Sequence, residues 1–119
     1  MSTEPVRASG TVLTVRAVEA YHAMTLVAPA VAERFRPGQF VAVAVGGEHT
    51  SLLRRRCFAV YEVKSDYGGS VEFVFADRDA GTRWLAGRRA RDSVDLVGPL
   101  GKPFPLPRVP VGGHELHRA

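Results

Sequence analysis

Apolar and polar residues alternate along most of this chain in short segments, and turn residues interrupt the alternation about every ten positions. In residues 11–20 the alternation places Leu13, Val15 and Ala17 on one face, and residues 22–29 alternate in the same way. A period of two residues is typical of β-strands, whose successive side chains point to opposite faces of a sheet. We therefore predict two strands that pair with each other.

The same pattern predicts four more strands. A proline-glycine turn in RPGQF leads into residues 40–45, whose unbroken apolar character predicts a strand covered on both faces. Residues 57–63 and 71–76 flank SDYGGS, which predicts a hairpin between them. Residues 93–101 form the last predicted strand and end on a Gly-Pro turn.

The period changes in DAGTRWLAGRRA, which predicts one short helix. Gly81 or Thr82 is expected as its N-cap, Trp84 and Leu85 as anchors that point inward, and Gly87 as its C-terminal stop. Trp84 is expected to plug the barrel from this helix.

Together these segments predict an all-β fold, a six-stranded antiparallel Greek-key barrel with one short helix. The barrel domain is expected to span residues 10–101, after an N-terminal tail of residues 1–9. Residues 102–119 are rich in proline and end in polar residues, so we expect a tail without packed structure of its own.

The composition fits one globular domain of 119 residues, 45% hydrophobic and 24% charged. No apolar run reaches the roughly 18 residues that a membrane span requires, and the N-terminus lacks the apolar core of a secretory signal. These observations predict a cytoplasmic protein. The single cysteine, Cys57, rules out an internal disulfide and an iron–sulfur cluster held by this chain alone.

The net charge of +4, carried mostly by arginine, favours an anionic partner such as the phosphates of a nucleotide. Binding to nucleic acid is disfavoured, because the arginines do not interleave with aromatic residues as a stacking surface requires. The excess charge also fits a role in solubility alone.

Two features predict an anion site. Arg56 stands at the start of the fourth strand, and Gly81-Thr82 stands at the start of the helix, where unpaired N–H groups favour negative charge. If the two elements adjoin, they converge on one anion, for which a pyrophosphate is the natural candidate. Thr82 is also an ordinary N-cap, which leaves a purely structural role open.

Four motifs in order, RPGQF, LLRRRCFAV, GTRWLA and VGPLGKPFPLP, give the chain a family resemblance over roughly residues 10–107. The chain resembles the flavin-binding barrel of the ferredoxin reductase superfamily, a fold of the riboflavin synthase type. It is most similar to the electron transfer subunit of dihydroorotate dehydrogenase.

The resemblance implies FAD as the cofactor and a set of residues that hold it. Arg56 is implied to contact a flavin phosphate, Phe58 to lie beside the isoalloxazine and ribityl chain, and Gly81 and Thr82 to hold the pyrophosphate. The full set of implied cofactor-binding residues is Arg56, Cys57, Phe58, Ala59, Val74, Phe75, Ala76, Gly81 and Thr82. No catalytic residue is assigned.

The chain departs from the family pattern in three ways. Ala59 replaces a serine whose hydroxyl is implied near the flavin N5, and Cys57 replaces a proline. The family continues into a nicotinamide-binding domain and a cysteine cluster, which this sequence does not include. We therefore expect a redox partner chain that supplies an NAD(P)H site or an acceptor site.

Two functions of different classes follow. The first is a FAD-binding oxidoreductase or electron-transfer component that works with a partner chain. The alternative is a cofactor-free barrel that binds, cyclises or isomerises a small apolar molecule in its interior, with Tyr61, Tyr67 or an arginine as polar handle. A homodimer is compatible with either function.

The remaining candidates for chemistry are weaker. Cys57 lies beside three arginines that would favour its thiolate, but a small buried strand residue is the favoured interpretation. His114 and His117 have the spacing of a metal pair without a third ligand, so no metal site is predicted.

Overall fold

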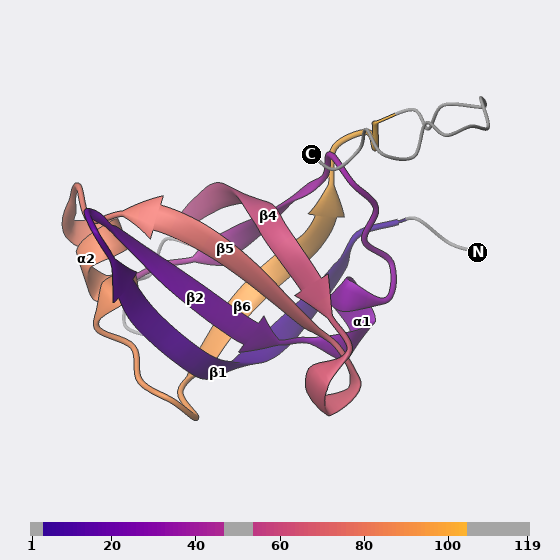
Figure 1. The fold of residues 1–119 in the computed structure, drawn as a ribbon. Helices are drawn as coiled ribbons and strands as arrows, with labels where there is room; N and C mark the ends of the chain where they lie inside the picture. Colours follow the sequence, from indigo (N-terminus) through magenta and orange to yellow (C-terminus); the bar gives the residue numbers. More distant parts are fainter. Residues whose placement is uncertain (1–3, 47–53, 105–119) are drawn as a thin grey trace, which may run out of the picture.

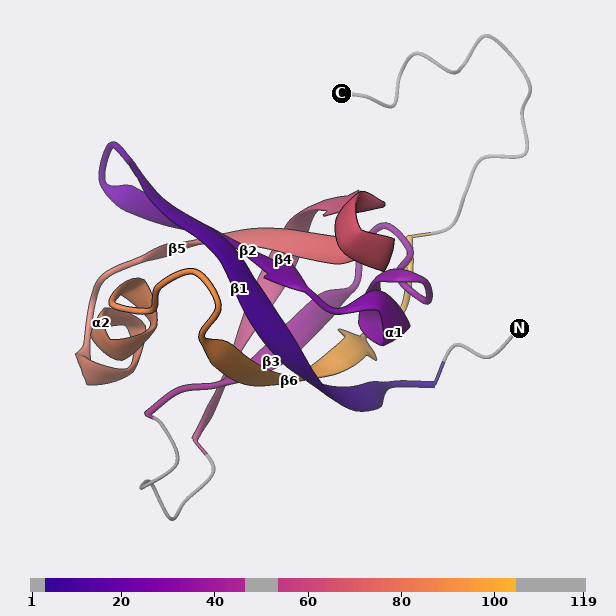
Figure 2. The same ribbon diagram turned by 90° about the horizontal axis from the view of Figure 1, so that it is seen from below.

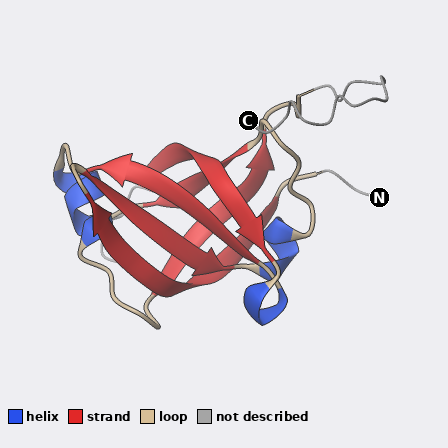
Figure 3. Cartoon of the chain, in the orientation of Figure 1, coloured by secondary structure: helices blue, strands red, loops and turns tan. Residues whose placement is uncertain are grey.

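The computed structural model describes residues 4–46 and 54–104, which form a closed antiparallel barrel with the strand order β1-β2-β5-β4-β3-β6 (Figures 1 and 3). The six strands are β1 (Val6–Val18), β2 (Tyr21–Val27), β3 (Phe40–Ala44), β4 (Arg55–Lys64), β5 (Ser70–Ala76) and β6 (Ser93–Leu100). The helices are α1 (Pro29–Ala32), the 3₁₀ turn η1 (Asp66–Gly68) and α2 (Ala80–Ala86). The predicted fold class is confirmed.

The first strand is longer than its sequence pattern predicts. β1 begins at Val6, and Val6 faces Gly98 in the β1–β6 pairing, so that residues 6–9 are part of the sheet. The expected pairing of the first two strands is confirmed, with a shift of register between Val12 and Thr14. Leu13 is the extra residue of this bulge, and the bulge reverses which positions point inward.

The bulge explains one error of the sequence analysis. Val12, rather than Leu13, is the fully buried residue at this point of β1, with 1% of its surface exposed. Val15 packs against the core from beyond the bulge, and Ala17 is exposed. Strict alternation fails here because one strand carries one more residue than its partner.

The two helices lie at opposite ends of the barrel (Figure 2). α1 is a single turn that the sequence analysis did not predict; Pro29 starts it, and Val31 points into the core with no exposed surface. α2 is the predicted helix, and Gly87 is its C-cap as expected.

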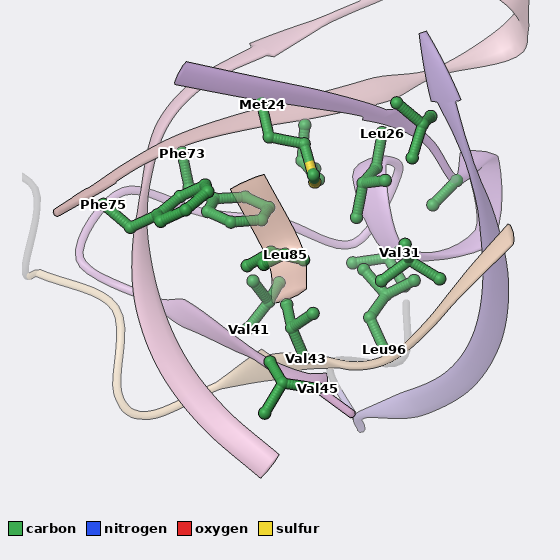
Figure 4. Packing of buried hydrophobic residues seen from close by; sticks show 14 of the residues in the cluster. Met24, Leu26, Val31, Val41, Val43, Val45, Phe73, Phe75, Leu85 and Leu96 are labelled. Carbon is green, nitrogen blue, oxygen red and sulfur yellow. The ribbon is translucent and has the colours of Figure 1, made fainter. Parts of the chain in front are cut away.

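Buried apolar side chains from five strands and from both α-helices fill the barrel, and the partly buried Phe58 and Val60 of β4 pack against them (Figure 4). Leu85 points from α2 into the core and is fully buried (Figure 4). Trp84, the expected plug, is only partly buried, and the guanidinium of Arg88 lies 4.2 Å from its ring centroid.

Two of the four family motifs meet where the chain leaves β6. Gly38, in the RPGQF turn, has a φ of 96°, and a Cβ atom there would lie 2.7 Å from the Phe104 ring. The N–H of Phe104 donates to the carbonyl of Pro37 at 2.9 Å. The turn therefore needs glycine both for its conformation and for the approach of Phe104.

Within the described ranges, no helix combines the length and apolar character that a membrane crossing needs.

Candidate functional site

The site begins where β4 and β5 separate. In the described residues, pairing between these strands ends at Val60 and Phe73, next to a bulge at Tyr61. Beyond this point the start of β4 pairs with β3 alone, and the end of β5 pairs with β2 alone. The barrel wall therefore has an opening between residues 55–59 and residues 74–76.

A cleft of about 360 Å³ occupies this opening. β4 and β5 form its two walls, the start of β2 adds to it, and the segment into α2 closes one end. The lining residues are Tyr21, Arg56, Phe58, Val74, Phe75, Ala76, Arg78 and Thr82. Six of these eight residues belong to the predicted cofactor-binding set.

Phe58 forms the apolar base of the cleft. Its ring stacks on that of Phe73, with centroids 4.9 Å apart, and lies 5.8 Å from that of Phe75. Both neighbours are core residues, so Phe58 is supported from behind while its other side faces the cleft. This arrangement offers a planar, rigid surface for a stacked ring.

Arg56 brings positive charge to the cleft next to α2. Its Nη2 lies 2.9 Å from Oδ2 of Asp79, and a Cβ on Gly81 would lie 3.3 Å from the same nitrogen. The predicted proximity of Arg56 to the start of this helix is thus confirmed. Hydrogen bonds from the Thr82 N–H and from Arg56 lower the pKa of Asp79 to about 2, so this carboxylate is charged at neutral pH.

The helix start differs from its prediction. Asp79 is the N-cap, in place of Gly81 or Thr82, and its Oδ1 accepts the Thr82 N–H at 3.0 Å. The Thr82 hydroxyl in turn accepts the N–H groups of Arg78 and Asp79. Both polar groups of Thr82 therefore serve the capping box, and its role toward a pyrophosphate stays a prediction.

Three residues of the predicted set do not line the cleft. Arg56 and Phe58 alternate along β4 with Cys57 and Ala59, which are exposed on the other face. The favoured interpretation of Cys57 as a buried strand residue is wrong. Gly81 contributes by having no side chain, which leaves room for the Arg56 guanidinium beside the helix.

Sequence reasoning missed Tyr21, and the predicted cofactor-binding set does not include Arg78. Tyr21 belongs to no motif, and it reaches the cleft because β2 pairs with β5, where it faces Ala76. Arg78 precedes the N-cap of α2 and lines the same end of the cleft as Thr82. The hypothesis about His114 and His117 lies outside the described residues.

Comparison with known proteins places this geometry in context. No family model matches the chain. The electron transfer subunit of dihydroorotate dehydrogenase B (NAD(+)) from Bacillus caldolyticus is 35% identical over 98 residues, which cover 82% of this chain and 37% of the relative. The corresponding subunit from Geobacillus thermodenitrificans is 34% identical over 98 residues, with the same coverage of both chains.

Solved structures agree on the fold. An NADH-dependent reduced ferredoxin-NADP oxidoreductase matches with a TM-score of 0.70 and 24% identity, over 81% of this chain and 35% of its own. A cytochrome P450 reductase from Amycolatopsis matches with a TM-score of 0.66 and 26% identity, over 87% of this chain and 31% of the reductase. A ferredoxin NADP+ reductase from Neisseria gonorrhoeae was solved with bound FAD and NADP. It matches with a TM-score of 0.61 and 18% identity, over 82% of this chain and 39% of the reductase.

The chain therefore has the barrel fold that is also found in these reductases, with a cleft in the barrel wall. Among curated proteins, the chain is similar to the electron transfer subunits of dihydroorotate dehydrogenase B, as its motifs predicted. It spans about 37% of the length of these relatives.

Proposed function

We propose that the chain binds FAD in the cleft between β4 and β5 and serves as the flavin-holding component of an electron-transfer oxidoreductase. The observation that carries this proposal is the convergence of Arg56, Phe58 and the unpaired edge of β5 on one opening. The similarity to electron transfer subunits, and the FAD bound by the Neisseria reductase, support it.

The lining residues match the parts of a flavin dinucleotide. Phe58 offers a face to the apolar side of the isoalloxazine. Residues 74–76 present backbone groups that have no strand partner on the β4 side, and such groups suit the polar edge of the ring system. Arg56 and Arg78 offer guanidinium groups to the phosphates.

When bound, the flavin supplies the redox chemistry, and the protein supplies orientation and electrostatics. Ala59 does not alter the cleft directly, because position 59 lies on the exposed face of β4. The loss of a serine hydroxyl there therefore leaves the lining of the cleft unchanged.

We assign the second redox site to a partner chain. The described residues build the barrel and its two short helices, and the cleft lies in the barrel wall. A site for NAD(P)H or for an acceptor, brought by a partner against the open side of the cleft, would complete the transfer.

Titration of the purified chain with FAD tests the proposal, followed by flavin fluorescence and by the visible absorbance of the bound cofactor. Arg56→Ala should weaken FAD binding by about 1–3 kcal/mol, the scale of a charge-assisted hydrogen bond. Arg89→Ala is the matched control, because Arg89 is exposed and does not line the cleft. Absence of FAD binding, or equal affinities of the wild type and Arg56→Ala, would contradict the proposal.

The cofactor-free alternative finds no support. A ligand inside the barrel would need the space that buried side chains fill (Figure 4). Tyr61 and Tyr67, its proposed polar handles, are 70% and 74% exposed and face solvent.

A further inference from the structure

One carboxylate connects the two elements that meet at the phosphate end of the cleft. Asp79 Oδ2 pairs with Arg56 Nη2 from β4 at 2.9 Å, while Asp79 Oδ1 accepts the Thr82 N–H within α2 at 3.0 Å. Each oxygen therefore has a separate partner. The orientation of the Arg56 side chain is tied to the N-cap of the helix.

The space around this contact is built for the guanidinium. A Cβ at position 81 would lie 2.9 Å from Val45 Cγ2 and 3.3 Å from Arg56 Nη2, so only glycine leaves Arg56 its place against the first turn of α2. Arg56 is thus held by Asp79, and the missing side chain of Gly81 leaves room for its guanidinium.

Stability alone does not explain this ion pair. The side chains of Arg56 and Asp79 are 37% and 43% exposed, and partly exposed pairs contribute little to folding. A guanidinium has five N–H donors, and the contact with Asp79 is made by one of its nitrogens, Nη2. Among the described residues the Arg56 guanidinium has no other ion-pair partner, so its remaining donors can serve the cleft that Arg56 lines.

We propose that Asp79 is a positioning residue of the flavin site, which fixes Arg56 in the orientation that presents its remaining N–H donors to a phosphate of FAD. This inference rests on the proposed function and adds to it a residue outside the predicted cofactor-binding set. Asp79 acts through Arg56 and does not line the cleft itself.

The negative charge of Asp79 also repels a bound phosphate. This repulsion weakens phosphate binding, whereas the positioning of Arg56 by Asp79 strengthens it. Repulsion acts between groups on different sides of the guanidinium, at an exposed position where solvent and salt screen it. Ordering a long arginine side chain costs more, because each of its rotatable bonds must be fixed on binding. Positioning therefore outweighs repulsion, and removal of the carboxylate weakens binding.

A double-mutant cycle tests this inference, with FAD and riboflavin titrated into the wild type, Asp79→Asn, Arg56→Ala and the double variant. Asp79→Asn keeps an N-cap oxygen and removes the charged partner of Arg56. We expect it to weaken FAD binding about five- to tenfold, the cost of ordering one long side chain. Binding of riboflavin, which lacks a phosphate, should be unchanged.

In the Arg56→Ala background, Asp79→Asn should change FAD affinity by less than about twofold, because the residue through which it acts is gone. Asp79→Ser is the second variant: serine preserves the cap, lacks the oxygen that reaches Arg56 and should repeat the loss. Urea unfolding of each variant shows whether the fold is intact.

Three results would overturn the inference: tighter FAD binding by Asp79→Asn, an undiminished effect in the Arg56→Ala background, or an equal loss for riboflavin. If Arg56→Ala weakens FAD binding and Asp79→Asn does not, the inference fails while the proposed function stands. If the wild type binds no FAD, both fail.

Discussion

At the scale of single residues, the outer face of the barrel holds a carboxylate that is almost completely removed from water. Glu72 on β5 is 2% exposed; it accepts a hydrogen bond from Arg16 Nη2 at 2.8 Å, and Lys64 Nζ lies 3.6 Å away. The two cations come from β1 and β4, so the contacts span four adjacent strands. A buried charge of this kind is tolerated only while its partners remain.

Glu72→Gln should therefore lower the free energy of unfolding by about 1–3 kcal/mol, since two cations lose their partner and the partners are themselves partly exposed. Urea unfolding at neutral pH measures the change. Glu62→Gln is the control, because Glu62 is exposed on β4 directly opposite Glu72, and its change should stay within about 0.5 kcal/mol. Equal changes in the free energy of unfolding for the two substitutions would show that the buried contacts of Glu72 do not contribute to stability.

The motif at the start of β4 predicts the lining of the cleft only in part. Arg56 and Phe58 were found from the start of β4, and the cleft contains both. Cys57 and Ala59 belong to the same motif, but strand alternation turns them to the exposed face. Tyr21 could not be predicted, because its place depends on which strand pairs with β5.

At the scale of the elements, one side chain ties three strands together across a fourth. Asp95 on β6 pairs with Arg7 of β1 at 3.1 Å and with Arg55 of β4 at 2.9 Å. Arg55 passes over β3, where its Nη1 also donates to the Ala42 carbonyl at 3.4 Å.

The stability from this contact should depend on pH. Burial raises the pKa of Asp95, and the hydrogen bonds from Arg7 and Arg55 more than offset this, so its pKa in the folded protein is below the ordinary 3.8. A lowered folded pKa stabilises the protein above the unfolded value, and this contribution is lost as the pH falls through the folded pKa.

Asp95→Asn should therefore lower the free energy of unfolding by about 1 kcal/mol at pH 7, the scale of a partly exposed ion pair. The difference in the free energy of unfolding between the wild type and Asp95→Asn should stay constant down to about pH 5. It should become smaller below pH 3.8. Urea unfolding at several pH values measures it, with Asp66→Asn in the exposed η1 turn as control. A difference that widens in acid would contradict the sign.

The elements themselves were predictable where a period extends over several residues. All six strands and α2 were found in order. The bulge at Leu13 was missed because a single extra residue is invisible to a pattern of alternation, and α1 was missed because one turn is too short to show a helical period. The N-cap was misplaced because Asp79 and Thr82 are both good caps, and only their mutual hydrogen bonds decide between them.

At the scale of the whole molecule, the six strands close into a barrel, and β4 and β5 separate along part of their boundary. The two helices cover the barrel ends, and the core fills its interior (Figures 2 and 4). The opening is therefore the place where a ligand reaches the sheet without disturbing the core. This combination of a closed fold and a local gap is what the sequence pattern alone could not predict.

Amide hydrogen exchange should report FAD at this gap. With FAD at about 100 times its Kd, exchange at residues 74–76 should slow by up to about 100-fold wherever exchange requires release of the ligand. Amides of β1 that pair with β6 lie away from the cleft, so those that exchange through local fluctuations should be unaffected. Unchanged exchange at residues 74–76 in the presence of FAD would contradict a site at this gap.

The unpaired edge of β5 also bears on how the barrel behaves toward its own copies. An exposed strand edge is a template for pairing with another chain, and proteins usually cover or charge such edges. Here Tyr21 and Val74, which are 49% and 40% exposed, add apolar surface beside it. A flavin in the cleft would cover this edge, so that a cofactor bound for redox work would also protect the barrel from edge-to-edge aggregation.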